Sequence, residues 1–187
     1  MDRRQAILSA LALPWATAQA SPAADAFWQR LRQGRCVVLM RHEQTVSGVG
    51  DPVGFRLGDC SSQRNLNETG RERSRALGRA FAQVGVWPDR VLSSAWCRCT
   101  DTAQLAFGTY QLWEPLNSFF GQGDGAAQLR RAQRRVQEHP PQGFEVWVTH
   151  QVNITGMTGQ VPSMGELFAC DTVMRDGRLP LVARWSV

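Results

Sequence analysis

Residues 36–45 read CVVLMRHEQT, a run of five apolar residues that leads into an arginine and a histidine. A continuous apolar run of this length is typical of a central strand that is covered on both faces of a sheet. Residues 145–150 (EVWVTH) follow a similar pattern, since a second buried-strand segment leads into Thr149 and His150. Two of the chain's three histidines therefore follow strands that we expect to be buried.

Helical and extended patterns alternate along the rest of the chain. Asn67 is a suitable cap for a helix over 68–84, where apolar residues recur at helical spacing. We expect further strands at 90–92, 109–112 and 145–148, a helix that follows Ser93-Ser94 and ends near Phe107, a helix over 125–138, and a C-terminal hairpin within 167–187 that turns at Asp176-Gly177. This order predicts an α/β fold, a three-layer α/β/α sandwich with a mostly parallel central sheet.

The length and composition describe one globular domain. The chain has 187 residues, of which 43% are apolar and 20% charged. All 21 basic residues are arginines, which excludes mechanisms that need a Schiff-base or P-loop lysine. The net charge of +5 is compatible with an anionic partner, and equally with a codon bias that favours arginine over lysine. Because basic and aromatic residues do not interleave in a recognition motif, we predict no nucleic-acid partner.

The first twenty residues are typical of a signal peptide. Arg3 and Arg4 precede an apolar run over 6–16, and Ala18-Gln19-Ala20 supplies the small-x-small pattern of a signal-peptidase site. The run is shorter than the ~20 residues that a membrane span needs, so stable membrane insertion is not expected. The arginine pair resembles a twin-arginine export signal, and an ordinary secretory signal is the alternative. We therefore predict a signal peptide over 1–20, a domain over 21–187, and a periplasmic or secreted location.

Five cysteines fit an exported protein and lack the pattern of a metal site. They are Cys36, Cys60, Cys97, Cys99 and Cys170, so at least one is unpaired. In an oxidising compartment we expect Cys60 to pair with either Cys97 or Cys99, and we expect Cys36 to be a small buried hydrophobe. The spacing of Cys97 and Cys99 is too tight for a common zinc site, and no histidine lies nearby. We predict no metal and no cofactor.

Polar residues gather where the predicted parallel strands end. Arg41 and His42 follow one strand, Arg98 lies in the first turn of the helix after another, and His150 follows a third. Because the carboxyl ends of parallel strands meet at one edge of a sheet, we expect these side chains to lie close together. Two arginines, two histidines and a helix N-terminus suit a tetrahedral dianion.

Four segments in this order resemble the motifs of the histidine phosphatase superfamily, the phosphoglycerate-mutase-like proteins. Residues 39–45 (LMRHEQT) resemble its Arg-His-Gly-x-Thr signature, and residues 66–70 (LNETG) resemble its Leu-Thr-x-x-Gly segment. Residues 92–103 (LSSAWCRCTDTA) resemble its Ser-Ser-x-x-x-Arg-x-x-x-Thr-Ala motif, and residues 148–150 (VTH) resemble its second, strand-end histidine. The resemblance spans about residues 35–160 and identifies the chain as an exported, bacterial-type member.

The resemblance implies a metal-independent phosphatase that acts on a small phosphomonoester or phosphoanhydride. His42 would attack phosphorus to give a phosphohistidine, which water would hydrolyse. Arg41 and Arg98 would bind the phosphoryl oxygens, and His150 would donate a further hydrogen bond to them. The sequence assigns neither the natural substrate nor an oligomeric state.

Two departures from the family pattern bear directly on the chemistry of the site. Glu43 replaces the usual glycine after the nucleophile, and its charge is expected to oppose an anionic substrate. Ser118 stands where the family often has an acidic residue, which leaves Glu43, Glu114 and Glu166 as candidate proton donors, or none. These departures are the reason for an alternative hypothesis, in which the protein is a catalytically inactive anion-binding or envelope-interaction protein on the same fold.

Overall fold

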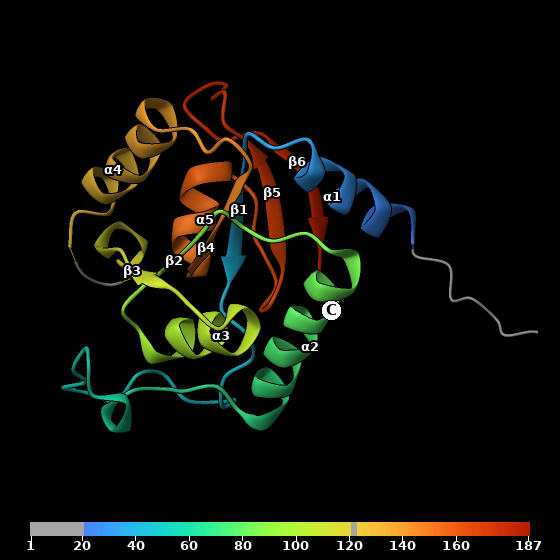
Figure 1. Ribbon diagram of the computed structural model, residues 1–187. Helices are drawn as coiled ribbons and strands as arrows, with labels where there is room; N and C mark the ends of the chain where they lie inside the picture. Colours follow the sequence, from blue (N-terminus) through green and yellow to red (C-terminus); the bar gives the residue numbers. More distant parts are fainter. Residues whose placement is uncertain (1–20, 121–122) are drawn as a thin grey trace, which may run out of the picture.

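The computed structural model describes residues 21–120 and 123–187, and a six-stranded sheet forms its centre (Figure 1). The strands are β1 (Cys36–Arg41), β2 (Arg90–Ser93), β3 (Gln111–Leu112), β4 (Phe144–Thr149), β5 (Leu167–Asp171) and β6 (Leu181–Trp185), in the order β3-β2-β4-β1-β5-β6. β1 to β4 are parallel, whereas β5 is antiparallel to both of its neighbours, β1 and β6. The mostly parallel sheet is therefore confirmed.

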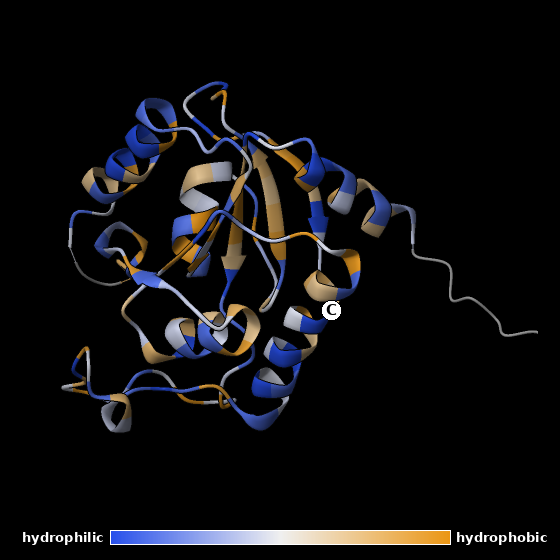
Figure 2. Ribbon diagram, viewed as in Figure 1, coloured by the Kyte–Doolittle hydropathy of each residue, from blue (hydrophilic) through white to orange (hydrophobic). Residues whose placement is uncertain are grey.

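Helices cover both faces of this sheet, which confirms the three-layer α/β/α sandwich. α1 (Pro22–Arg32), α2 (Glu68–Val84) and α3 (Cys97–Phe107) pack on one face, and α4 (Gly125–Glu138) and α5 (Gln151–Thr158) pack on the other. In β1, Val38 and Met40 belong to the first core, while Val37 and Leu39 belong to the second. Figure 2 shows the same arrangement, with apolar strands in the centre and polar residues on the outer helix faces.

Close packing between α2 and the chain after β1 fixes one wall of the site. A Cβ atom at Gly70 would lie 2.1 Å from the carbonyl oxygen of Gln44, so only glycine permits this approach. Asn67 caps α2, because its side chain accepts a hydrogen bond from the Gly70 N–H at 2.8 Å. The Asn67 N–H in turn donates to the Gln44 carbonyl at 3.1 Å. These contacts hold residues 42–45 over the first turn of α2.

Three elements show how the structure compares with the predicted boundaries. α1 was not predicted, and its Phe27 and Trp28 pack against Trp185 of β6. β3 covers only two of the four residues expected in that strand. The C-terminal hairpin is confirmed, and its turn contains Asp176 and Gly177, both with positive φ.

The predicted signal peptide over 1–20 lies outside the described residues. Within the described ranges, no helix has both the length and the apolar character that a membrane span requires.

Candidate functional site

The carboxyl ends of β1 and β4 bring the two histidines together. Arg41 pairs with Thr149 in the parallel register of these strands, and the His42 N–H donates to the Thr149 carbonyl at 3.0 Å. The imidazole rings of His42 and His150, 108 positions apart in sequence, have centroids 5.5 Å apart. The expected meeting of these strand ends is therefore seen in the structure.

The His42 ring is held with one nitrogen free for chemistry. Nδ1 lies 2.8 Å from the main-chain carbonyl oxygen of Glu43, and because a carbonyl can only accept, Nδ1 carries the proton. Nε2 then carries the lone pair. Burial lowers the pKa of His42 to about 3, and the charges of Arg98, Arg41 and Arg64 act in the same direction, against the hydrogen bond to Glu43. His42 is therefore a neutral imidazole with an available lone pair across the physiological pH range.

His150 is fixed by a network at the start of α3. Its Nε2 lies 2.9 Å from the Ser94 hydroxyl, which donates to the Asn117 side-chain oxygen at 3.2 Å. Because Ser94 has only one proton to give, this network assigns the proton between the two residues to Nε2 of His150. Burial lowers the pKa of His150 well below its usual value, and the neighbouring His42, when protonated, and the nearby arginines act in the same direction. Nδ1 of the neutral ring is thus left as a proton acceptor, so in this arrangement His150 does not have the donor role toward phosphoryl oxygens that the resemblance implies.

Three arginines converge on these histidines, and sequence reasoning anticipated two of them. Arg41 donates through Nη1 to the Pro162 carbonyl at 2.9 Å, and Arg98 donates through Nη1 to the Asp51 carboxylate at 2.8 Å. The third is Arg64, whose positive charge lowers the pKa of Arg41, His42 and His150.

The three guanidinium groups retain hydrogen-bonding capacity at this edge of the sheet. In Arg41, Arg64 and Arg98, the Nε atom is buried and meets no hydrogen-bond acceptor among residues 21–120 and 123–187. Burial and mutual repulsion lower the pKa of Arg41 and of Arg64. Positive charges at close range, with N–H groups that still lack an acceptor, favour the binding of an anion with several oxygens.

Asp51 and Arg64 are functional candidates that sequence reasoning missed. Arg64 lies two residues before the Leu66-Asn67 segment, and this proximity to a recognised motif is the signal that was overlooked. Asp51 lies in a loop without periodic pattern, and its Oδ1 accepts the Arg64 N–H at 3.1 Å as well as Arg98. It is therefore the carboxylate that links two of the three arginines.

A cavity of about 170 Å³ opens at the two histidines. Its walls are formed by Arg41, His42, Ser118, Phe120, His150, Gln151 and Val152. Of the three arginines, Arg41 forms part of these walls, whereas Arg64 and the 4% exposed Arg98 are not among the lining residues. Ser118, which occupies the position of the expected acid, faces the cavity, so the departure from the family pattern falls within the candidate site itself.

The three candidate proton donors lie elsewhere. Glu43 is fully buried and pairs with Arg73 at 3.2 Å, and burial raises its pKa although Arg73 opposes the shift. Its charge is therefore compensated, contrary to the expectation that it opposes an anionic substrate. Glu114 pairs with Arg131 on the surface, and Glu166 pairs with Arg184 at 3.2 Å. None of the three carboxylates lines the cavity.

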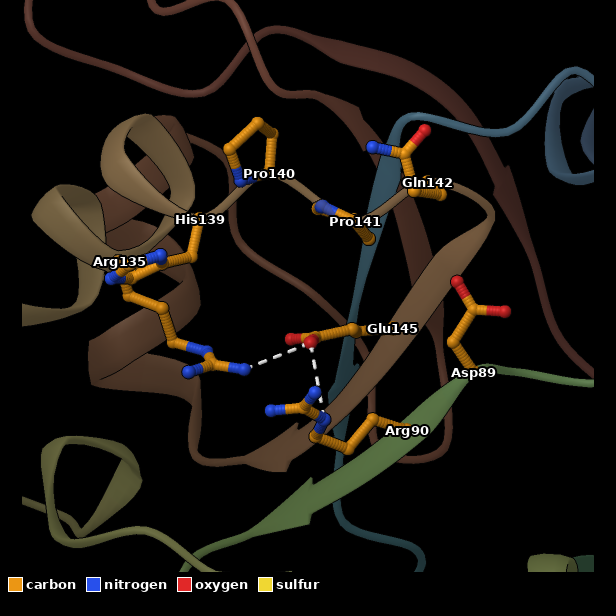
Figure 3. Close-up of a pocket in the computed structure, with 8 residues that line it drawn as sticks. All are labelled: Asp89, Arg90, Arg135, His139, Pro140, Pro141, Gln142 and Glu145. Carbon is orange, nitrogen blue, oxygen red and sulfur yellow. Dashed lines mark hydrogen bonds and ion pairs between the residues drawn. The ribbon is translucent and has the colours of Figure 1, made fainter.

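A larger cavity of about 750 Å³ lies at the opposite end of β4 (Figure 3). Its two arginines share one carboxylate, because Arg135 and Arg90 both reach the buried side chain of Glu145, at 2.8 and 3.6 Å. Trp147 also donates to Glu145, at 2.9 Å. The charges in this cavity stabilise an ion pair at the amino end of the strand, so we place the candidate site at the carboxyl edge.

A disulfide joins Cys60 to Cys97, the residue before Arg98. Of the two pairings that the sequence left open, the structure therefore contains the one with Cys97. Cys36, Cys99 and Cys170 are free and buried, and Cys99 Sγ lies 3.5 Å from His150 Nε2. In the described part of the chain, no group of three or more histidine, cysteine or acidic side chains is arranged to hold a metal ion.

Comparisons with known proteins agree with this geometry. A model of the histidine phosphatase superfamily (branch 1) matches residues 37–125, which confirms the resemblance to that superfamily. The match includes His42, Arg64 and Arg98 and ends before His150. No curated protein matches the sequence.

Solved structures share the fold. The protein histidine phosphatase SixA, complexed with tungstate, has a TM-score of 0.53 at 15% identity, over 81% of this chain and 96% of that chain. The alpha-ribazole phosphatase from Shigella flexneri has a TM-score of 0.57 at 19% identity, over 79% and 95% of the two chains. The product of an open reading frame from Mycobacterium tuberculosis has a TM-score of 0.56 at 19% identity, over 78% and 94%. At such identities the likeness shows the fold alone.

Proposed function

We propose that this protein is a phosphatase that works through a phosphohistidine on Nε2 of His42. The observation that carries the proposal is the neutral His42 ring, whose Nδ1 is committed to the Glu43 carbonyl, beside three arginines with donors to spare. The superfamily match and the phosphatases among the fold relatives support the same reaction class.

The reaction has two displacements at phosphorus. In the first, the Nε2 lone pair of His42 forms a bond to phosphorus, and the bond to the leaving group breaks with its electron pair. Arg41, Arg64 and Arg98 stabilise the charge on the phosphoryl oxygens. In the second, a water oxygen bonds to phosphorus, and the electron pair of the N–P bond returns to Nε2. Nδ1 of His150 is available to accept a proton from that water. In this proposal the positive field comes from the three guanidinium groups and needs no metal.

We further propose that the substrate has a leaving group that departs without a proton. Among the residues that the structure describes, no carboxylate lines the cavity, and Ser118 is too weak an acid to protonate an alkoxide near neutral pH. A phosphoanhydride, an aryl phosphate or an N-phosphorylated imidazole meets this requirement, whereas a simple sugar phosphate does not. A phosphohistidine on a protein is one member of this class, and the fold likeness to the protein histidine phosphatase SixA favours testing it.

The alternative is an inactive anion-binding or envelope-interaction protein. Incubation with an aryl phosphate separates the two, because only a phosphatase releases the phenol. We expect turnover by the wild type and none by His42→Ala, and we expect an acid-labile phosphoryl group on His42 after rapid quenching. Label on a serine or cysteine, or full activity in His42→Ala, contradicts the mechanism. Binding of phosphate without turnover supports the alternative.

Export is a separate proposal, supported by the leader pattern over 1–20 and by the Cys60–Cys97 disulfide, since disulfides persist in oxidising compartments. The full chain, expressed with its leader, should be recovered outside the cytoplasm with an N-terminus near Ser21. An intact Met1 on cytoplasmic protein would contradict it.

A further inference from the structure

Residues 46–66, here called the arm, carry Arg64 and Asp51 to the candidate site. The arm contains little regular structure: a three-residue 3-10 turn over Cys60–Ser62, and a single bridge at its base between Thr45 and Leu66. Four of its apolar side chains, at positions 46, 49, 53 and 57, are exposed. Phe55 packs against Trp96 with ring centroids 5.6 Å apart. A segment with so few core contacts needs other constraints to hold a side chain in place.

Those constraints converge on the N-terminus of α3. The disulfide joins Cys60 of the arm to Cys97, and the Gln63 side chain accepts the Cys97 N–H at 2.9 Å. Within the arm, Gln63 also donates to the Arg56 carbonyl at 2.8 Å, and Asn65 donates to the Cys60 carbonyl at 2.7 Å. Arg64 therefore lies between two residues whose side chains are tied to the segment that the disulfide fixes.

Asp51 closes the same arrangement from the other side. Its Oδ1 accepts the main-chain N–H of Arg64 and the guanidinium of Arg98, at 3.1 and 2.8 Å. Arg98 Nη1 also lies 3.5 Å from the Arg64 carbonyl. Asp51 thus links the two arginines through its hydrogen bonds, and the Cys60–Cys97 disulfide covalently links the two segments that carry them.

We infer that the Cys60–Cys97 disulfide is a positioning device that keeps Arg64 beside Arg98, so that the affinity of the site for phosphate depends on the oxidised state of this pair. The choice of phosphate as the anion rests on the proposed function. The proposed nucleophile His42 directly follows β1 and does not depend on the arm for its own hydrogen bond. Loss of the disulfide should therefore weaken anion binding more than it slows the chemical step.

The bond is accessible to a reductant. Cys60 is exposed, whereas Cys97 is 3% exposed, so a dithiol is expected to attack Sγ of Cys60. The attacking thiolate forms a mixed disulfide with Cys60 and releases the Cys97 thiolate, which takes up a proton. The second thiolate of the reductant then attacks the reductant's own sulfur in the mixed disulfide, which closes the reductant into a cyclic disulfide and releases the Cys60 thiolate, which takes up a proton. The protein ends with two thiols, and the reductant carries the disulfide.

The test measures binding of inorganic phosphate by calorimetry, without turnover. Oxidised wild type, wild type reduced with dithiothreitol, and Cys60→Ala/Cys97→Ala are compared, with thiol counts and thermal unfolding recorded for each. We expect the Kd for phosphate to rise about ten-fold in the reduced and double-variant proteins, as expected for partial loss of one charge-assisted contact. Reductant should have no further effect on the double variant. Cys36→Ala, in the core away from the arm, should bind phosphate like wild type.

A positioning role is separated from general loosening by Arg64→Ala. If the disulfide acts through Arg64, reduction should change the Kd of Arg64→Ala less than two-fold, because the effect has already been removed. An equal Kd in oxidised and fully reduced wild type overturns the inference, as does a ten-fold effect of reduction that persists in Arg64→Ala. Because binding is measured directly, either result stands whether or not the protein hydrolyses phosphate esters.

Discussion

The carboxylate of Asp51 lies 2.8 Å from the guanidinium of Arg98, although the two residues are 47 positions apart in sequence. Burial alone would raise the pKa of Asp51, but hydrogen bonds from Arg98 and from the Arg64 N–H, with their charges, hold it below its usual value. Asp51 is therefore ionised near neutral pH. It serves as the counter-ion of two arginines and not as a proton donor to a leaving group.

Asp51→Asn should lower the free energy of unfolding at neutral pH by up to about 1 kcal/mol, because the side chain is partly solvated. A depressed pKa means that this stability is present above the unfolded-state pKa of about 3.9 and is lost as the pH falls through the lower folded-state value. Urea unfolding of both proteins at pH 7, 5 and 3 measures the difference. Glu68→Gln, in an exposed pair, is the control and should show a smaller effect. A difference that stays constant down to pH 3 would contradict the ion pair.

The two buried histidines predict a second effect of pH on the free energy of unfolding, and like that of Asp51 it lowers stability at acidic pH. His42 and His150 are neutral and buried in the folded domain, whereas each binds a proton near pH 6.5 in the unfolded chain. Stability should therefore be intact above pH 6.5 and should fall below it, by about 1.4 kcal/mol per pH unit for each histidine that remains neutral. Urea unfolding between pH 7.5 and 4.5 measures this slope. His42→Gln should reduce it, because this variant removes one of the two buried imidazoles.

The strand ends were predictable because their signal is local. An apolar run followed by a polar pair marks both β1 with His42 and β4 with His150, and parallel strands must end at a common edge. Arg98 was predictable because α3 begins directly after β2 and the turn between them.

The arm was not predictable for a physical reason. Arg64 reaches the site because a disulfide, the Asp51 carboxylate and the close approach of Gly70 to Gln44 fix the arm, and each of these contacts joins distant parts of the chain. No periodic pattern records them. The same is true of Glu43, whose partner Arg73 is 30 positions away.

The proposed mechanism predicts activity without a metal, because arginines supply the positive charge around the phosphoryl group. After dialysis against EDTA, hydrolysis of an aryl phosphate should be unchanged, because Arg41, Arg64 and Arg98 bear the charge on the phosphoryl oxygens in the proposed mechanism. Arg98→Ala, by contrast, should reduce the rate and weaken phosphate binding together. Loss of activity in EDTA that Mg²⁺ or Zn²⁺ restores would require a metal.

The composition of the cavity predicts a steep dependence of rate on the leaving group. Departure of an alkoxide needs a proton, and general acid catalysis contributes about 10²–10⁴-fold where it is present. Ser118 lines the cavity where an acid is expected, so that contribution should be missing for poor leaving groups. The measurement is a series of aryl and alkyl phosphates of increasing leaving-group pKa. Glu114→Gln should leave the slope unchanged, because its carboxylate pairs with Arg131 at the surface. Glu43→Gln should leave it unchanged as well, because Glu43 pairs with Arg73 away from the cavity.

Ser118→Asp supplies the decisive comparison within this series. An aspartate at a position that faces the cavity would place a carboxyl group within the candidate site, so the slope should become shallower and the gain should be confined to poor leaving groups. Ser118→Asn has nearly the same shape without a titratable proton, and it should retain the steep slope of the wild type. A shallow slope in the wild type that steepens in Glu43→Gln would show that this glutamate moves to act as the acid. A shallow slope in all five proteins would mean that another group donates the proton, and the preference for anhydrides and other activated phosphoryl compounds would then be wrong.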